Sequence, residues 1–74
     1  MSRLPVISGR ELIKILERIG FEQKRQKGSH VILVKDNKVT VVPLHKEVDR
    51  GTLIEIIRQC GMKRNEFIEL ISKK

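Results

Sequence analysis

The clearest place for chemistry in the sequence is the run Lys-Arg-Gln-Lys-Gly-Ser-His, which ends at His30. Phosphate could bind its three cations, which are Lys24, Arg25 and Lys27. The backbone N–H groups of a tight turn at Gly28 and Ser29 could bind the same anion, and His30 could take or give a proton near neutral pH. A plain hairpin turn followed by a hydrogen-bonded histidine would give the same residues, so their spacing alone leaves both interpretations open.

Cleavage of RNA is a reaction that suits such a group of residues. The reaction removes the proton of a 2′-hydroxyl, protonates the leaving 5′-oxygen and places charge on the phosphate. One histidine with lysine and arginine neighbours could serve all three needs. His45, in the segment Pro43-Leu44-His45, could be a second proton-transfer group across the loop from His30, and an exposed loop histidine without a catalytic role is the alternative.

Two further sets of residues could bind a polyanion. Arg10, Lys14 and Arg18 recur at every fourth position, so on a helix they would form a basic ridge. An ordinary solvated helix face explains them equally well, because two glutamates lie nearby in the sequence. Arg50 opens a second predicted helix, whose N-terminus would attract anions, although ordinary helix capping accounts for the same residues.

Composition limits what else the chain can do. The 74 residues are enough for one domain at most. Sixteen lysines and arginines against nine acidic residues give a net charge of +7, which favours a polyanionic partner such as nucleic acid. The sequence has two Phe and neither Trp nor Tyr, so stacking of unpaired bases on aromatic side chains is nearly excluded.

The single cysteine and the lack of long apolar runs exclude several other classes. Cys60 alone can form neither an internal disulfide nor a cysteine-based zinc site, and we expect it to be a buried core thiol. The acidic residues form no pair typical of metal or glycosidase chemistry, so we expect no cofactor and no metal. No apolar run approaches the roughly 20 residues of a membrane span. The first residues do not resemble a signal peptide. We therefore expect a cytoplasmic protein without a membrane partner.

The elements that would position these residues begin with a helix over residues 9–19. Ser8 and Glu11 form the capping-box pattern at its start, and Gly20 lies where a helix often ends. Its apolar stripe has helical spacing and consists of Leu12, Ile15, Leu16 and Ile19.

Three strands are predicted next. Residues 22–27 are almost entirely charged or polar and suit an exposed edge strand. Two apolar strands follow, joined by a two-residue type I′ turn at Asp36-Asn37, and Pro43 ends the last of them.

The turn sets the register of this hairpin. It pairs Lys35 with Lys38, Val34 with Val39, Ile32 with Val41, and His30 with Pro43. We expect the last three pairs to form the apolar face that packs on the helices, with His30 at its margin. The opposite face, with Val31, Leu33 and Val42, would be a partner surface or would be covered by the last helix.

Two more helices complete the chain. One starts between Asp49 and Thr52, with either residue as its cap, and stops at Gly61. The last spans residues 63–72, and its start looks poorly capped because Lys63 offers no acceptor. The order α-β-β-β-α-α predicts an α+β fold with a three-stranded antiparallel sheet, in a single domain over residues 1–74.

Four segments together carry a resemblance to a known family. They are Gly9-Arg10-Glu11-Leu12 with Leu16 and Gly20-Phe21; Arg25-Gln26-Lys27-Gly28-Ser29-His30; Val39-Thr40-Val41 with Pro43-Leu44-His45; and Gly51-Thr52-Leu53 with Ile56 and Arg58-Gln59-Cys60-Gly61. The ordered set resembles the HicA toxins, small mRNA interferases of type II bacterial toxin–antitoxin pairs. The very short Asp36-Asn37 turn and the extra helix after residue 61 depart from the family pattern, and the turn leaves the RNA path near the hairpin open.

The resemblance implies a fold like that of double-stranded-RNA-binding domains, α-β-β-β-α, here with an extra C-terminal helix. It also implies cleavage of mRNA without a metal, with the histidine of the Gly-Ser-His motif, His30, as the catalytic residue. A HicB-type antitoxin would be the protein partner and would supply the contact with operator DNA.

Three functions remain to be compared. The first is an endoribonuclease toxin with His30 as base or acid and Lys24, Arg25 and Lys27 around the phosphate. The second is a non-catalytic RNA-binding module that recognises RNA shape with the same surface. The third is a basic scaffold for an acidic protein.

Overall fold

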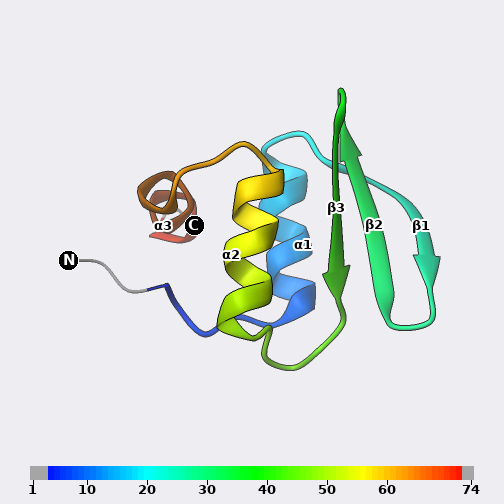
Figure 1. Cartoon of the computed structure of the whole chain (residues 1–74), viewed down its shortest axis with the longest axis horizontal. Helices are drawn as coiled ribbons and strands as arrows, with labels where there is room; N and C mark the ends of the chain where they lie inside the picture. The colour runs from blue at the N-terminus through cyan, green and yellow to red at the C-terminus, as the bar shows by residue number, and fades with distance from the viewer. Residues whose placement is uncertain (1–3, 73–74) are drawn as a thin grey trace.

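Three layers make up the fold in the computed structural model, which describes residues 4–72 (Figure 1). The antiparallel sheet has the order β1-β2-β3. Helices α1 and α2 cover one face of it, and α3 lies beyond them, on the side away from the sheet. The elements are α1 (Gly9–Arg18), β1 (Glu22–Lys27), β2 (His30–Lys35), β3 (Lys38–Pro43), α2 (Arg50–Gln59) and α3 (Arg64–Ser72). The predicted α+β class and order are confirmed.

Helix α1 begins with the predicted capping box. The Glu11 carboxylate accepts the backbone N–H of Ser8 at 3.1 Å, and the Ser8 hydroxyl accepts the backbone N–H of Glu11 at 3.1 Å. The helix ends one residue earlier than predicted, with Ile19 as its cap, and Gly20 follows with a φ of 106°. Of the predicted stripe, Leu12, Ile15 and Leu16 are buried and Ile19 is partly buried, and Ile13 is buried as well.

The sheet has the predicted register. β3 pairs with β2 from Lys35–Lys38 to His30–Pro43. β1 is a fully exposed edge strand with an irregularity between Gln23 and Arg25. The turn between β2 and β3 differs from the prediction, because among the described non-glycine residues only Asp36 has a positive φ, 55°, whereas a type I′ turn needs two such residues.

The prediction of which sheet face meets the helices was wrong. The buried side chains are Val31, Leu33, Thr40 and Val42. The opposite, open face carries Ile32, Val34, Val39 and Val41. Both faces are rich in β-branched and aliphatic residues, so their pattern could not choose between them. The Thr40 hydroxyl is accommodated inside because it donates to the Gln59 side chain on α2 at 2.7 Å.

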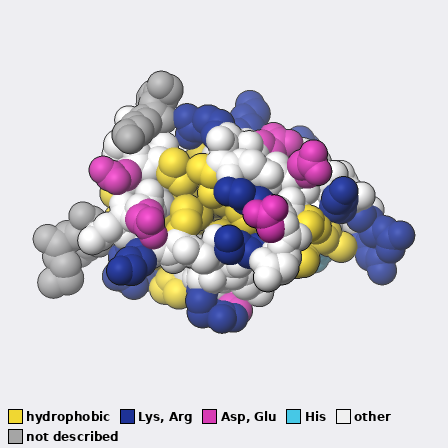
Figure 2. Space-filling model, turned by 90° about the horizontal axis from the view of Figure 1, so that it is seen from above, with side chains coloured by type: hydrophobic (Ala, Val, Ile, Leu, Met, Phe, Trp, Pro, Cys, Tyr) yellow, Lys and Arg dark blue, Asp and Glu magenta, His cyan; other side chains and the backbone are white. Residues whose placement is uncertain are grey.

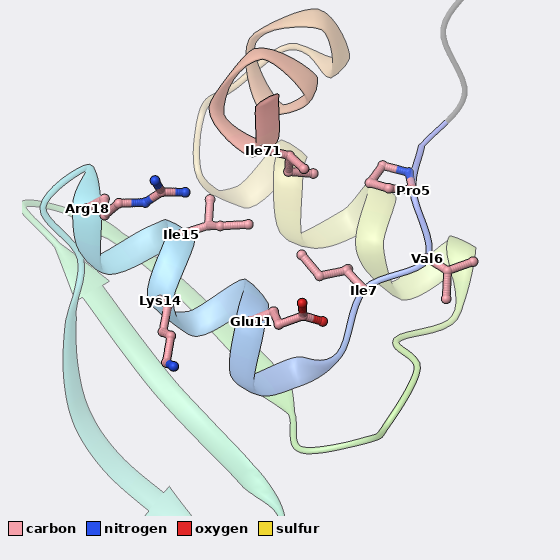
Figure 3. A pocket seen from close by; sticks show the side chains of 8 residues that line it. All are labelled: Pro5, Val6, Ile7, Glu11, Lys14, Ile15, Arg18 and Ile71. Atoms are coloured by element: carbon pink, nitrogen blue, oxygen red, sulfur yellow. The ribbon is translucent and has the colours of Figure 1, made fainter. Parts of the chain in front are cut away.

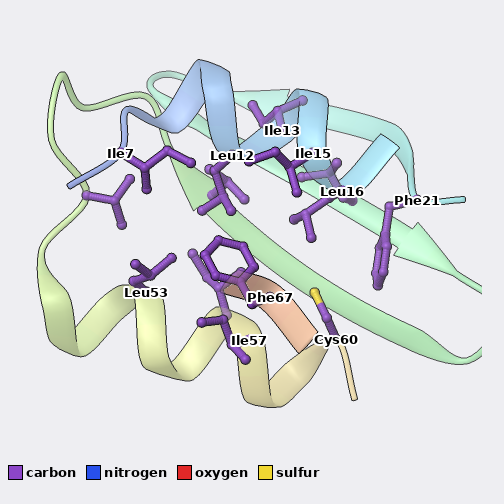
Figure 4. Packing of buried hydrophobic residues seen from close by; sticks show 14 of the residues in the cluster. Ile7, Leu12, Ile13, Ile15, Leu16, Phe21, Leu53, Ile57, Cys60 and Phe67 are labelled. Atoms are coloured by element: carbon purple, nitrogen blue, oxygen red, sulfur yellow. The ribbon is translucent and has the colours of Figure 1, made fainter. Parts of the chain in front are cut away.

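The core lies between the sheet, α1 and α2, and α3 closes it with Phe67 (Figure 4). That ring is fully buried and points among side chains of α1 and α2. Asp49 caps α2, accepting the backbone N–H of Thr52 at 3.0 Å. The weak start expected for α3 is compensated, since the Glu66 carboxylate accepts the backbone N–H of Lys63 at 2.7 Å.

Candidate functional site

His30 is the first residue of β2 and is exposed on the open face of the sheet. It lies opposite Lys27 on β1 and Pro43 on β3. Arg25 pairs with Ile32, two positions further along the same face. The expectation that His30 borders the helix-packed face is therefore wrong, because the helices pack on the other face. This position places an imidazole beside two cations with open access from solvent.

The turn before His30 is bound to the segment that follows β3. Gly28 has a φ of 56°, and its carbonyl accepts the side-chain amide of Gln26 at 3.0 Å. The carbonyl of Ser29 accepts the backbone N–H of Leu44 at 2.6 Å. These bonds fix the Gly28-Ser29 turn against the loop that carries the second histidine.

His45 is held from the other side by the start of α1. The backbone N–H of Gly9 donates to the His45 carbonyl at 2.9 Å. A Cβ atom on Gly9 would lie only 2.0 Å from the Pro43 carbonyl oxygen, so the close approach of these segments requires glycine. The two imidazole rings meet edge to face, with centroids 6.5 Å apart and planes at 70°. Both histidines are exposed.

The cations predicted on α1 separate into two surroundings. Arg10 and Lys14 line a groove of about 300 Å³ between α1 and β1, together with Gln23 and Gln26. Arg18 instead turns toward α3, where its guanidinium donates to the Leu70 carbonyl at 3.3 Å. Of the three cations of the predicted ridge, only Arg10 and Lys14 therefore border the strand that leads to His30.

Lys24 and Arg50 also lie apart from the histidine pair. Lys24 is at the irregularity of β1, and its ammonium lies 3.8 Å from the Glu22 carboxylate. Arg50, the first residue of α2, lines a hollow with Pro5 and Glu47. Dark-blue lysine and arginine side chains project at the right-hand end of Figure 2, the end where Figure 1 places β1.

Two of the described groups with shifted pKa values are Asp49, whose pKa shifts because it caps a helix, and Cys60, whose pKa shifts because it is buried. The hydrogen bonds from the Thr52 side chain and backbone lower the pKa of Asp49, and the charge of His45 lowers it further. Burial raises the pKa of Cys60 to about 11, so this thiol is a core group with low nucleophilicity.

A second hollow, of about 530 Å³, lies between the segment before α1, α1 itself and α3 (Figure 3). Its walls are mainly apolar, with Glu11, Lys14 and Arg18 among the residues around it. It contains neither histidine. Within residues 4–72, no three histidine, cysteine, aspartate or glutamate side chains gather as metal ligands would. Over the same residues, no helix has the length and apolarity needed to cross a membrane.

Sequence reasoning missed two features of the site. The open face beside His30 is apolar, with Val39 and Val41 exposed to 53% and 41%. Their residue types signalled a buried strand, and only the position of the helices makes them a surface. The contact of Gly9 with the Pro43-Leu44-His45 segment was also missed, because nothing local in the sequence indicates it.

Taken together, the site combines an accessible imidazole, a second imidazole and an adjacent strand of cations, which suits proton transfer on a phosphodiester. A search of curated proteins found no match. A family model described as the HicA toxin of bacterial toxin–antitoxin systems matches residues 9–62, which include both histidines and most of the described elements. The match covers well over half of the sequence, and the chain therefore belongs to the HicA family of toxins from toxin–antitoxin systems.

Proposed function

We propose that this toxin is an endoribonuclease that cleaves mRNA without a metal, with His30 as its catalytic residue. The observation that carries the proposal is the exposed position of His30 at the start of β2, on the same sheet face as Lys27 and Arg25. An imidazole in this place can reach a ribose–phosphate linkage without any movement of the core. The family membership supports a toxic activity of this kind.

The cations have graded roles in this proposal. Lys27 and Arg25, on the face of His30, bind the phosphate at the cleaved linkage or stabilise the charge that develops on it. Lys24 and the backbone of Gly28 and Ser29 bind the same phosphate or the next one. The RNA strand continues along outlying cations, which are Arg10, Lys14 and Arg50.

The open sheet face supports a proposal about the protein partner. Its apolar residues are the exposed Val39 and Val41 and the partly buried Ile32 and Val34, and they begin beside His30. We propose that a HicB-type antitoxin covers this face and so keeps RNA from His30. The complex would contact operator DNA through the antitoxin. We also propose that the protein acts in the cytoplasm and that residues 1–74 form one domain.

Replacement of His30 by alanine tests the catalytic assignment. We expect His30→Ala to slow cleavage of a defined RNA by about 10²- to 10⁴-fold, the usual effect of removing a proton-transfer group. RNA affinity and thermal unfolding should change little, because the ring is exposed. Asn37→Ala, at the exposed turn at the other end of β2, serves as the matched control and should cleave normally.

Two results would contradict the proposal. A His30→Ala protein that degrades RNA at the parental rate would show that His30 is not catalytic. A parental protein that binds RNA but cleaves none would favour the non-catalytic RNA-binding module.

A further inference from the structure

We infer that His45 is a second catalytic residue, which gives a proton to the leaving 5′-oxygen while His30 takes the proton of the 2′-hydroxyl. This inference rests on the proposed ribonuclease function. It starts from the ring pair: two exposed imidazoles from different segments of the chain have centroids 6.5 Å apart. At this separation, a single phosphodiester can place one oxygen within hydrogen-bonding reach, about 3 Å, of each ring.

The backbone around His45 is fixed on both sides. The Leu44 N–H donates to Ser29, the neighbour of His30, and the His45 carbonyl accepts the N–H of Gly9. The backbone positions from which the two rings project are therefore coupled through main-chain bonds. Such a defined backbone framework favours proton transfer to two oxygens of one phosphate.

The reaction balances with two imidazoles and no further reagent. The 2′-oxygen attacks phosphorus as neutral His30 accepts the 2′-hydroxyl proton, and the phosphorus–O5′ bond breaks as protonated His45 donates a proton to the leaving oxygen. The products are a 2′,3′-cyclic phosphate and a 5′-hydroxyl end. One ring has gained a proton and the other has lost one, and exchange with water restores both.

The two rings have different charged neighbours. Asp49 lies near His45: its carboxyl pKa is lowered mainly by the hydrogen bonds from Thr52 and to a smaller extent by His45. His30 instead lies directly across the sheet from Lys27.

A substrate with an altered leaving group tests the inference. The probe is an RNA oligonucleotide with one cleavable linkage, prepared either with the natural 5′-oxygen or with sulfur in its place. A thiolate leaves without being protonated, so loss of a general acid matters only for the oxygen substrate. We expect His45→Ala to cleave the oxygen linkage about 10²- to 10⁴-fold more slowly and the sulfur linkage at nearly the parental rate.

Controls separate the possible failures. His30→Ala should be slow on both substrates, and Glu47→Ala, an exposed change in the same loop, should be normal on both. If the parental protein cleaves both linkages and His45→Ala cleaves the oxygen linkage at the parental rate, the inference is wrong and the proposed function stands. Equal losses on both linkages would also overturn it. A parental protein that cleaves neither would overturn the proposed function itself.

Discussion

Gly9 is the residue on which the geometry of the site depends most directly. It is buried at the first position of α1, and its N–H donates to the carbonyl of His45. The space that a side chain would fill is occupied by the Pro43 carbonyl oxygen, 2.0 Å from where a Cβ would lie. The helix start, the end of β3 and the His45 loop therefore meet only because this position lacks a side chain.

Gly9→Ala is expected to destabilise the protein by about 1–3 kcal/mol, because the backbone must move to admit the methyl group. The same movement displaces His45, so RNA cleavage should fall by more than the loss of folded protein explains. Gly51→Ala is the matched control: it is also in the first turn of a helix, but its added Cβ would approach no atom closer than 3.5 Å. Denaturant unfolding and cleavage rates measure both effects, and equal stability of the two variants would contradict this account.

Residue types in the sequence were sufficient to select His30 and His45 as candidates, but not to pair them. The two positions are separated by a strand, a turn and a second strand. Their approach depends on the long-range hydrogen bonds of Ser29 with Leu44 and of Gly9 with His45. Neither bond has a local signature, since any backbone N–H or carbonyl can take part.

At the scale of elements, the sequence predicted the strands and their register well and the orientation of the sheet badly. A two-residue turn fixes which residues lie opposite one another, and this is local information. The choice of face depends on where the helices pack. β2 offers Val31 and Leu33 on one face against Ile32 and Val34 on the other, so hydrophobicity gave no preference. The decision comes from tertiary packing, including the bond of Thr40 to α2.

Helix α3 lies beyond the matched residues 9–62, yet it contributes to the core through Phe67. Phe67→Ala should cost about 3–5 kcal/mol, from lost burial and the cavity left behind. A domain of this size has a total stability of about the same magnitude, so the variant should be largely unfolded at 25 °C. Phe67→Leu keeps most of the volume and should fold, with a lower midpoint of denaturation. A fully folded Phe67→Ala protein would mean that α3 is dispensable for the fold.

At the scale of the whole molecule, the net charge of +7 favours a polyanionic partner but does not say where on the surface it binds. The described cations surround the molecule, on β1, along α1 and at the start of α3. The proposed function requires the cations of β1 to carry more of the binding than those of α3. The salt dependence of RNA affinity distinguishes these two sites, because each phosphate contact contributes a defined slope.

The comparison uses two double variants in the inactive His30→Ala background. Arg25→Ala with Lys27→Ala removes two cations from the face of His30, and Lys63→Ala with Arg64→Ala removes two exposed cations at α3. Each pair lowers the net charge equally. For single-stranded RNA we expect the first pair to reduce the slope of log affinity against log salt by about 1.4, and the second to leave it nearly unchanged. Equal slopes in the two variants would mean that overall charge holds the RNA, and the β1 face would then lose its assigned role.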